Sequence, residues 1–322
     1  MLAISAMGLA ACGQTLAATP GTHPAGATSS TTTTSTLPPP PPGLPPPTAL
    51  VPLASPPLAG EGQWTAAGRS VSGSPVLYIT TLRAPGSDTP AGIAWMDTSR
   101  LRGTLYSGSI SPGQGPWTYT APVSPAAALT LVCAFNGGFK LADTHGGYYA
   151  EGRYFAPLVD GAASLVITQD GTVTVGQWGR DELMAANVVA VRQNLTLLVD
   201  QGAPVPGLSA SDTAVWGSTL NYVPQVYRSG VGETAGGALV YVSGPSLDIV
   251  QLAALLVAAG AVRGMELDIN PAWDTFAFYT PPTPSGAAAP ANGTELLASM
   301  SGGPSRFFDP SWARDFITMS TR

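Results

Sequence analysis

The chain is poor in charged residues, in lysine and in cysteine. Only 10% of its 322 residues are charged, the formal net charge is -6, and Lys140 is the single lysine. A surface with this balance repels polyphosphate backbones, so nucleic acid is not expected as a partner. The two cysteines, Cys12 and Cys133, do not indicate a disulfide framework, and neither His23 nor His145 lies at ligand spacing from a cysteine, so no metal site is predicted.

Long apolar runs are also missing. Beyond the amino terminus no uninterrupted apolar stretch reaches 18 residues, so no transmembrane helix is expected. Glycine and proline are abundant instead, with 38 and 32 residues. Prolines, threonines and serines concentrate in residues 13–60, which cannot bury enough apolar surface to fold and are predicted to form a disordered stalk. Residues 61–322 are then expected to form the folded domain.

The amino terminus is similar to a bacterial lipoprotein signal. Residues 1–12 are mostly apolar and end Leu9-Ala10-Ala11-Cys12, which resembles the lipobox that presents a cysteine for lipid attachment, although a basic n-region is missing. The alternative interpretation is a short disordered apolar tail. The lipobox predicts that Cys12 carries the lipid, and that the protein is extracellular and anchored to the cell membrane, with the stalk lifting the domain into the cell wall.

Short apolar and β-branched runs between turn residues predict that the middle of the chain is mostly sheet. Strands are expected at 76–81, 92–96, 129–135, 164–168, 172–175, 188–192 and 195–199, with a hairpin turn at Gln169-Asp170-Gly171. One helix is expected at Leu247–Ala259, with Ser246 as its N-cap and Gly260 after its end. Strands at 238–242 and 262–269 flank it, which suggests a strand-helix-strand unit with a parallel crossover. The predicted fold class is α+β, a mixed β-sheet with covering helices.

The second of these flanking strands carries a polar face. Alternation places Glu266, Asp268 and Asn270 on one side, with the two carboxylates about 6 to 7 Å apart. This separation permits glycosyl chemistry without selecting a stereochemical outcome. Pro271 ends the strand, and Trp273 beyond it is expected to form an aromatic platform at a pocket rim. The alternative is a strand whose outer face is merely solvated.

Three stretches resemble the phosphodiester glycosidase family. The family's Asn-Gly-Gly-Phe motif is similar to Ala134-Phe135-Asn136-Gly137-Gly138-Phe139. Its Arg-x-x-x-Gly segment is similar to Arg228-Ser229-Gly230-Val231-Gly232. Its helix, followed by Gly-Ala and then Leu-Asp-Gly-Gly, is similar to the predicted helix followed by Gly260-Ala261 and Leu267-Asp268. The resemblance covers about residues 129–273. The chain departs from the family after Asp268, where Ile269-Asn270-Pro271 replaces a glycine-rich loop that lets a phosphate approach the backbone.

The resemblance implies a glycoside hydrolase that cleaves the glycosidic bond of a sugar-1-phosphodiester at the cell surface or in the cell wall. Asp268 is expected to act as base or cation stabiliser, with Glu266 second, and Arg228 to hold the phosphate. Substrate-binding roles are expected for Asn136, Gly137, Gly138, Asn270 and Trp273. The alternative from another class is a non-catalytic lipoprotein with the same fold that binds cell-wall glycan through Trp273, Tyr148 and Tyr149.

Overall fold

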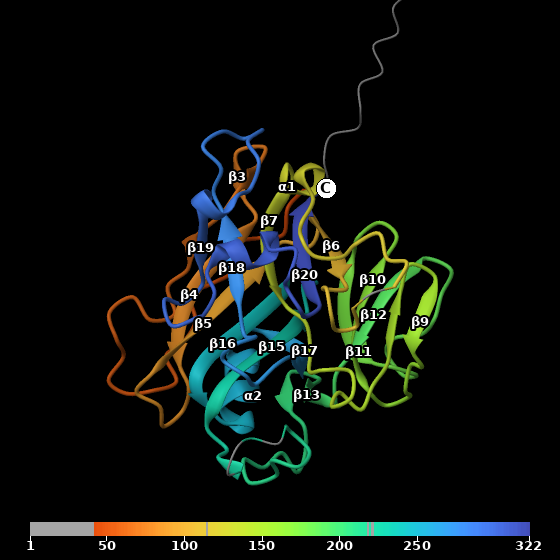
Figure 1. The fold of residues 1–322 in the computed structure, drawn as a ribbon. Helices are drawn as coiled ribbons and strands as arrows, with labels where there is room; N and C mark the ends of the chain where they lie inside the picture. The colour runs from red at the N-terminus through yellow and green to blue at the C-terminus, as the bar shows by residue number, and fades with distance from the viewer. Residues whose placement is uncertain (1–41, 114, 218, 220–221) are drawn as a thin grey trace, which may run out of the picture. The chain divides into compact units, whose positions relative to one another are not determined.

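The structure is a computed structural model that describes residues 42–113, 115–217, 219 and 222–322. The lipobox, with Cys12, and most of the expected stalk lie outside these residues. The described residues belong to one compact unit. Its regular secondary structure is mostly β-sheet (Figure 1).

The described ranges contain four sheets. The largest has eight strands in the order β1 (Thr65–Ala66), β4 (Leu77–Arg83), β5 (Pro90–Met96), β16 (Leu239–Leu247), β15 (Val226–Thr234), β17 (Ala261–Glu266), β13 (Leu197–Asp200) and β14 (Ala203–Pro204). One five-stranded sheet has the order β11 (Val173–Gln177), β10 (Ala163–Thr168), β12 (Val188–Gln193), β8 (Tyr148–Ala150) and β9 (Arg153–Ala156). The other has the order β19 (Gly293–Glu295), β18 (Phe276–Tyr279), β7 (Leu131–Asn136), β20 (Phe316–Thr321) and β6 (Leu101–Tyr106). A small sheet joins β2 (Ser70–Val71) to β3 (Ser74–Pro75).

Helices are short and few in this part of the chain. The α-helices are α1 (Pro125–Ala128) and α2 (Ile249–Ala258), and 3-10 helices lie at Pro290–Asn292 and Pro304–Phe308. Among the described residues no helix combines the length and the apolar character needed to cross a bilayer.

The expected α+β class with covering helices is wrong, because the fold is nearly all-β and its named strands pair antiparallel. The segments β16, α2 and β17 do follow one another along the chain. However, β15 lies between the two strands and pairs antiparallel with both. Two antiparallel steps restore the direction, so β16 and β17 point the same way without sharing a hydrogen-bond ladder. The sequence pattern around β16, α2 and β17 cannot reveal that β15 lies between the two strands.

The sequence predicts the C-terminal end of α2 correctly but not its N-cap. Asp248, not Ser246, is the N-cap: its side chain accepts a hydrogen bond from the N–H of Gln251 at 2.8 Å. Gln251 completes a capping box by accepting from the N–H of Asp248 at 3.1 Å. At the other end Gly260 follows the C-cap with φ +92°, as expected for a helix terminator.

The strands of the large sheet are buried on both faces where the sheet is central. In β16, Leu239 and Tyr241 belong to one apolar cluster, whereas Val240 and Val242 belong to another, as strand alternation requires. The second cluster contains the buried face of α2. The first joins the large sheet to both five-stranded sheets, and it includes Cys133, a buried free thiol. The expected strands all overlap observed ones. In the large sheet, this double burial explains why a central strand such as β16 is apolar at consecutive positions.

The end of the expected stalk packs on the domain. Leu44, Leu50 and Leu53 lie against the cluster that contains α2, and the N–H of Leu44 donates to Oδ2 of Asp97 at 3.1 Å. The N–H of Leu50 donates to the carbonyl oxygen of Gly62 at 2.9 Å. The folded part therefore begins at or before Leu44, whereas the proline content predicts a boundary at residue 61. The difference arises because leucines between the prolines supply apolar surface that the domain buries.

Candidate active site

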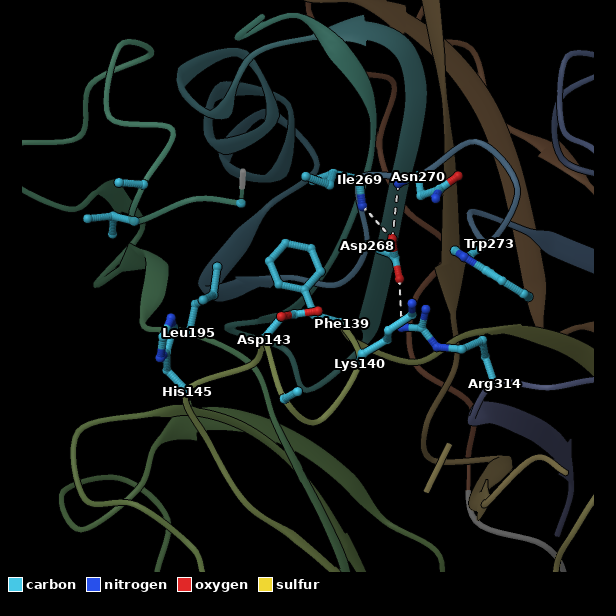
Figure 2. A pocket seen from close by; sticks show the side chains of 14 residues that line it. Phe139, Lys140, Asp143, His145, Leu195, Asp268, Ile269, Asn270, Trp273 and Arg314 are labelled. Atoms are coloured by element: carbon cyan, nitrogen blue, oxygen red, sulfur yellow. Dashed lines mark hydrogen bonds and ion pairs between the residues drawn. The ribbon is translucent and has the colours of Figure 1, made fainter. Parts of the chain in front are cut away.

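A cavity of about 370 Å³ opens beside the end of β17 (Figure 2). Its polar lining comes from segments that are far apart in the sequence: Lys140, Asp143 and His145 after β7, Asp268, Asn270 and Trp273 after β17, and Arg314 before β20. Buried Phe139 and Leu195 contribute to its apolar wall. Strand ends from two different sheets thus meet around one space.

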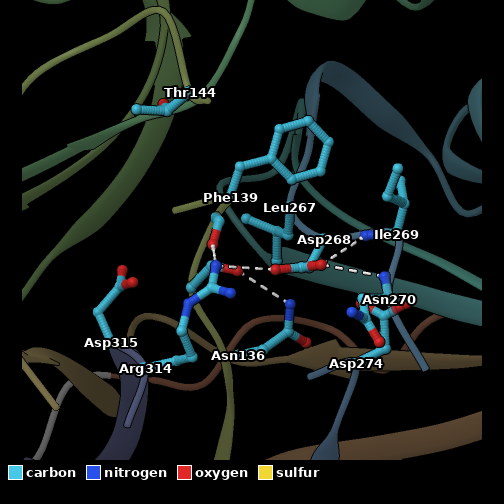
Figure 3. Close-up of polar contacts among 12 residues, drawn as sticks. Asn136, Phe139, Thr144, Leu267, Asp268, Ile269, Asn270, Asp274, Arg314 and Asp315 are labelled. Carbon is cyan, nitrogen blue, oxygen red and sulfur yellow. Dashed lines mark hydrogen bonds and ion pairs between the residues drawn. The ribbon is translucent and has the colours of Figure 1, made fainter. Parts of the chain in front are cut away.

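Asp268 lies at the centre of the polar contacts (Figure 3). The residue is only 4% exposed. Its Oδ1 accepts hydrogen bonds from the N–H groups of Ile269 and Asn270 at 2.8 and 3.0 Å, and its Oδ2 accepts from Nη2 of Arg314 at 2.9 Å. Burial raises the pKa of Asp268, and the Arg314 cation together with the two amides opposes that rise. These contacts hold the carboxylate oriented and stabilise its ionised form.

Arg314 is a site residue that the sequence pattern did not reveal. Its Nη2 also donates to the carbonyl oxygen of Gly138 at 2.7 Å, and its Cζ lies 5.2 Å from the centre of the Trp273 ring. Such a placement gives a cation–π contact. Among the described residues its Nε has no hydrogen-bond partner. The arginine that contacts Asp268 is therefore Arg314, whereas Arg228 was the arginine expected to hold the phosphate.

Arg228 and Glu266 form a buried ion pair that does not line this cavity. The Nη1 of Arg228 donates to Oε1 of Glu266 at 2.5 Å, and its nitrogens also donate to the carbonyl oxygens of Leu247, Trp216 and Pro224. Both side chains are 1% exposed or less. Every guanidinium nitrogen is thus satisfied inside the protein, which leaves none directed at a phosphate. Burial raises the pKa of Glu266 to about 7, although Arg228 opposes this rise.

The two glycines of the Asn-Gly-Gly-Phe segment serve the packing of the protein itself. A Cβ on Gly137 would lie 2.1 Å from Oδ2 of Asp315, and one on Gly138 would lie 2.9 Å from Oδ1 of Asn194. Asp315 forms a buried salt bridge with Arg192, with Nε and Oδ2 2.7 Å apart. Neither glycine lines the cavity. The close approach that was expected of a substrate is instead made by buried side chains of the domain.

Asn136 likewise lies behind the cavity rather than in its wall. Its Nδ2 donates to Oγ of Ser229 at 3.0 Å, and its Oδ1 accepts from the hydroxyl of Tyr241 at 2.8 Å. Ser229 also accepts from the N–H of Asp268 at 3.1 Å and donates to Oδ1 of Asp274 at 2.6 Å. Burial, and next the charge of Asp268, raise the pKa of Asp274 well above its usual range. Asn136 thus helps to position Asp268 through Ser229.

The chain after Asp268 makes a compact turn. The carbonyl oxygen of Asn270 accepts from the N–H groups of Trp273 and Asp274 at 2.8 and 3.0 Å. This turn brings Asn270 and Trp273 into the cavity lining. Trp273 packs against Trp312, with ring centres 5.2 Å apart, so its ring is held at the cavity by a second aromatic residue.

Comparison with known proteins yields distant likenesses. No protein-family model and no curated protein matches the chain. Among solved structures it is similar to the catalytic domain of zebrafish N-acetylglucosamine-1-phosphodiester alpha-N-acetylglucosaminidase auto-inhibited by its pro-peptide, with 18% identity, a TM-score of 0.48, and 81% of this chain and 88% of that chain covered. It is also similar to a hypothetical protein from Synechocystis, with 12% identity, a TM-score of 0.42, and 80% of this chain and 64% of that chain covered. A Burkholderia pseudomallei protein that is described as an exported protein is similar with 14% identity, a TM-score of 0.37, and 73% of this chain and 75% of that chain covered. These values indicate a distant fold relationship only, so the chemistry has to be argued from the residues of the site.

Proposed function

We propose that the protein hydrolyses the glycosidic bond of a sugar-1-phosphodiester. The observation that carries this proposal is the pairing of buried Asp268 with Arg314 in a cavity that Lys140 and Trp273 also line. The two cations suit the oxygens of a phosphate, and the indole ring suits the apolar face of a sugar. The carboxylate lies beside the cation, where the anomeric carbon and the phosphate of such a substrate would meet.

The distribution of carboxyl groups favours a phosphate leaving group over an ordinary alcohol. Most glycosidases need a second carboxyl group that stays protonated and donates its proton to the departing oxygen. In the described lining that second group is Asp143, which is exposed. Glu266 and Asp274, whose pKa values burial raises, lie outside the lining. A phosphate departs as an anion and needs little protonation, so the single buried carboxylate suffices.

In the proposed reaction the bond between C1 and the phosphate oxygen breaks, and its electron pair leaves with the phosphate monoester. Arg314 and Lys140 hold the phosphate oxygens. Asp268 stabilises the positive charge that develops at C1 and takes a proton from the water whose oxygen adds to C1. The products are the free sugar and a phosphate monoester.

The test separates binding from turnover. Asp268→Asn is nearly isosteric and should lower turnover by orders of magnitude while ligand binding is largely kept, whereas Arg314→Lys should weaken binding and turnover together. Arg102→Lys, an exposed arginine outside the cavity lining, is the matched control. Hydrolysis of a panel of sugar-1-phosphodiesters and calorimetric binding of the same compounds give both readouts. A wild type that binds cell-wall glycan fragments but hydrolyses no diester would replace this proposal with the glycan-binding alternative.

We also propose that the protein acts outside the cell, anchored through lipid on Cys12. The support is the sequence Leu9-Ala10-Ala11-Cys12 followed by a proline-rich segment. Cys12→Ser should release the protein into the medium or leave its signal uncleaved, as cell fractionation would show. A Cys12→Ser protein that both fractionates and is cleaved like wild type would contradict the anchor.

A further inference from the structure

A second cavity, of about 350 Å³, adjoins the candidate active site. Both cavities are lined by His145, Leu195, Ala214 and Val215. Asp268, Arg314 and Trp273 line the first cavity only. In Figure 2, His145 and Leu195 lie across the first cavity from Trp273 and Arg314. The second cavity therefore continues the first on the side away from Trp273.

The lining residues follow a fixed order from one end of the two joined cavities to the other. Trp273, at one side, offers the aromatic surface for the sugar, and Asp268 with Arg314 comes next. Lys140 lies between these residues and His145 in the same view. A phosphodiester bound with its sugar at Trp273 would place its phosphate at the two cations. The group on the other side of the phosphate would then extend past His145 into the second cavity.

The lining of the second cavity is mainly apolar. Val159 and Val215 are 44% and 43% exposed, although valines usually lie inside a domain. Buried Ala162 and Leu195 line the same space. The lining also contains one acidic residue, Asp160, whose carboxylate would repel a second phosphate. Exposed valines in a cavity that continues a polar site indicate a ligand portion that covers them.

We propose that the second cavity binds an apolar aglycone, so that the substrate is a sugar-1-phosphate esterified with a hydrocarbon alcohol. This inference rests on the proposed hydrolysis and specifies its substrate class. A sugar or nucleoside aglycone would bury many hydroxyl and amide groups, which need hydrogen-bond partners. In the described lining only His145, Asp160 and Thr196 have polar side chains, a small set for so many groups. A hydrocarbon chain needs no such partners.

The kinetic test varies only the aglycone. For methyl, butyl and octyl esters of one sugar-1-phosphate, kcat/KM should rise by about fourfold for each methylene that becomes buried, until the cavity is filled. Val159→Asp places a charge in the second cavity without touching the first, and it should reduce the ratio of octyl to methyl ester kcat/KM by at least tenfold. Val51→Asp, at a valine that is 77% exposed and outside both cavities, should keep the wild-type ratio.

A binding test separates this inference from the hydrolysis on which it rests. Calorimetry compares methyl phosphate with octyl phosphate below its micelle concentration, for wild type and Val159→Asp. Tighter octyl phosphate binding that Val159→Asp removes supports the apolar subsite even if no diester is hydrolysed, in which case only the catalytic proposal fails. Diester hydrolysis with no dependence on chain length, and equal binding of the two phosphates, would overturn the apolar aglycone while leaving hydrolysis in place. Preference for a glycosyl ester over the octyl ester would overturn it as well.

Discussion

The hydroxyl of Ser229 donates a 2.6 Å hydrogen bond to Oδ1 of Asp274, a carboxyl group without exposed surface. The same hydroxyl oxygen accepts from the N–H of Asp268, so Ser229 connects the backbone of Asp268 to a second carboxyl group behind the cavity. Two ionised carboxylates so close together in a buried region would repel each other. Burial, and next the charge of Asp268, raise the pKa of Asp274 well above its usual range, which favours its protonated form.

A protonated Asp274 should tolerate replacement by its neutral isostere. Asp274→Asn should change the free energy of unfolding by no more than about 1 kcal/mol. Asp315→Asn is the matched comparison, because Asp315 is equally buried but ion-paired with Arg192, and it should cost about 3 to 5 kcal/mol. Urea unfolding at pH 7 measures both. Similar large losses in the two variants would mean that Asp274 is ionised.

Glu266 should make stability depend on pH in a defined direction. Its pKa rises from 4.5 to about 7 on folding, so the folded chain binds the extra proton between these values. The contribution of Glu266 to stability is complete below pH 4.5 and is lost as pH rises to about 7. Relative to Glu266→Gln, which cannot titrate, wild type should therefore lose about 3 kcal/mol between pH 4.5 and pH 8. Unfolding curves across this pH range test whether wild type loses stability relative to Glu266→Gln. A difference in the free energy of unfolding that stays constant with pH would show that Glu266 does not titrate there.

Gly137 should not accept even a methyl group. Gly137→Ala would force a Cβ to within 2.1 Å of the Asp315 carboxylate, which its salt bridge with Arg192 holds in place. Overpacking of this kind costs about 1 to 3 kcal/mol and should also displace neighbouring Arg314, lowering activity. Gly236→Ala is the control, because the nearest atom to its new Cβ is 3.9 Å away. If Gly137→Ala melts and turns over substrate like the control, the proposed close packing is wrong.

The leucines near residue 50 should contribute to the stability of the domain. A chain that starts at Glu61 lacks Leu44, Leu50 and Leu53, and should be less stable than one that starts at Pro40 by roughly 2 to 5 kcal/mol. Each kcal/mol corresponds to about 2 to 4 °C in Tm for a domain of this size. Thermal melts of the two chains compare them directly. Equal midpoints would show that this segment adds no stability.

The sequence predicted local features of the site better than its assembly. The turn after Asp268 and the aromatic residue at position 273 follow from alternation and a proline, and the structure places both at the cavity. Arg228 was assigned to the phosphate because it is an arginine in a short motif, and no local pattern distinguishes an arginine in a buried ion pair from one in a cavity. Arg314 lies 46 residues from Asp268, in a segment without a recognisable motif. The long-range pairing of β20 with β7 and β6 brings it there.

The fold class does not follow from the local pattern for a related reason. Periodicity identified the strands and α2, but it carries no information on which strand pairs with which. The insertion of β15 between β16 and β17 turned an expected parallel unit into an antiparallel sheet. Such pairings are fixed by long-range packing of faces that look alike in the sequence.

The position of β20 has a consequence for how the protein comes into being. Ribosomes make β6 and β7 about two hundred residues before β20, the strand that must lie between them. Until it arrives, both strands expose an unpaired edge, which makes the nascent chain prone to misassociation. Arg314 and Asp315 immediately precede this late strand. The contact between Asp268 and Arg314 can thus form only late in synthesis, and an incomplete translation product that stops before residue 314 would lack it.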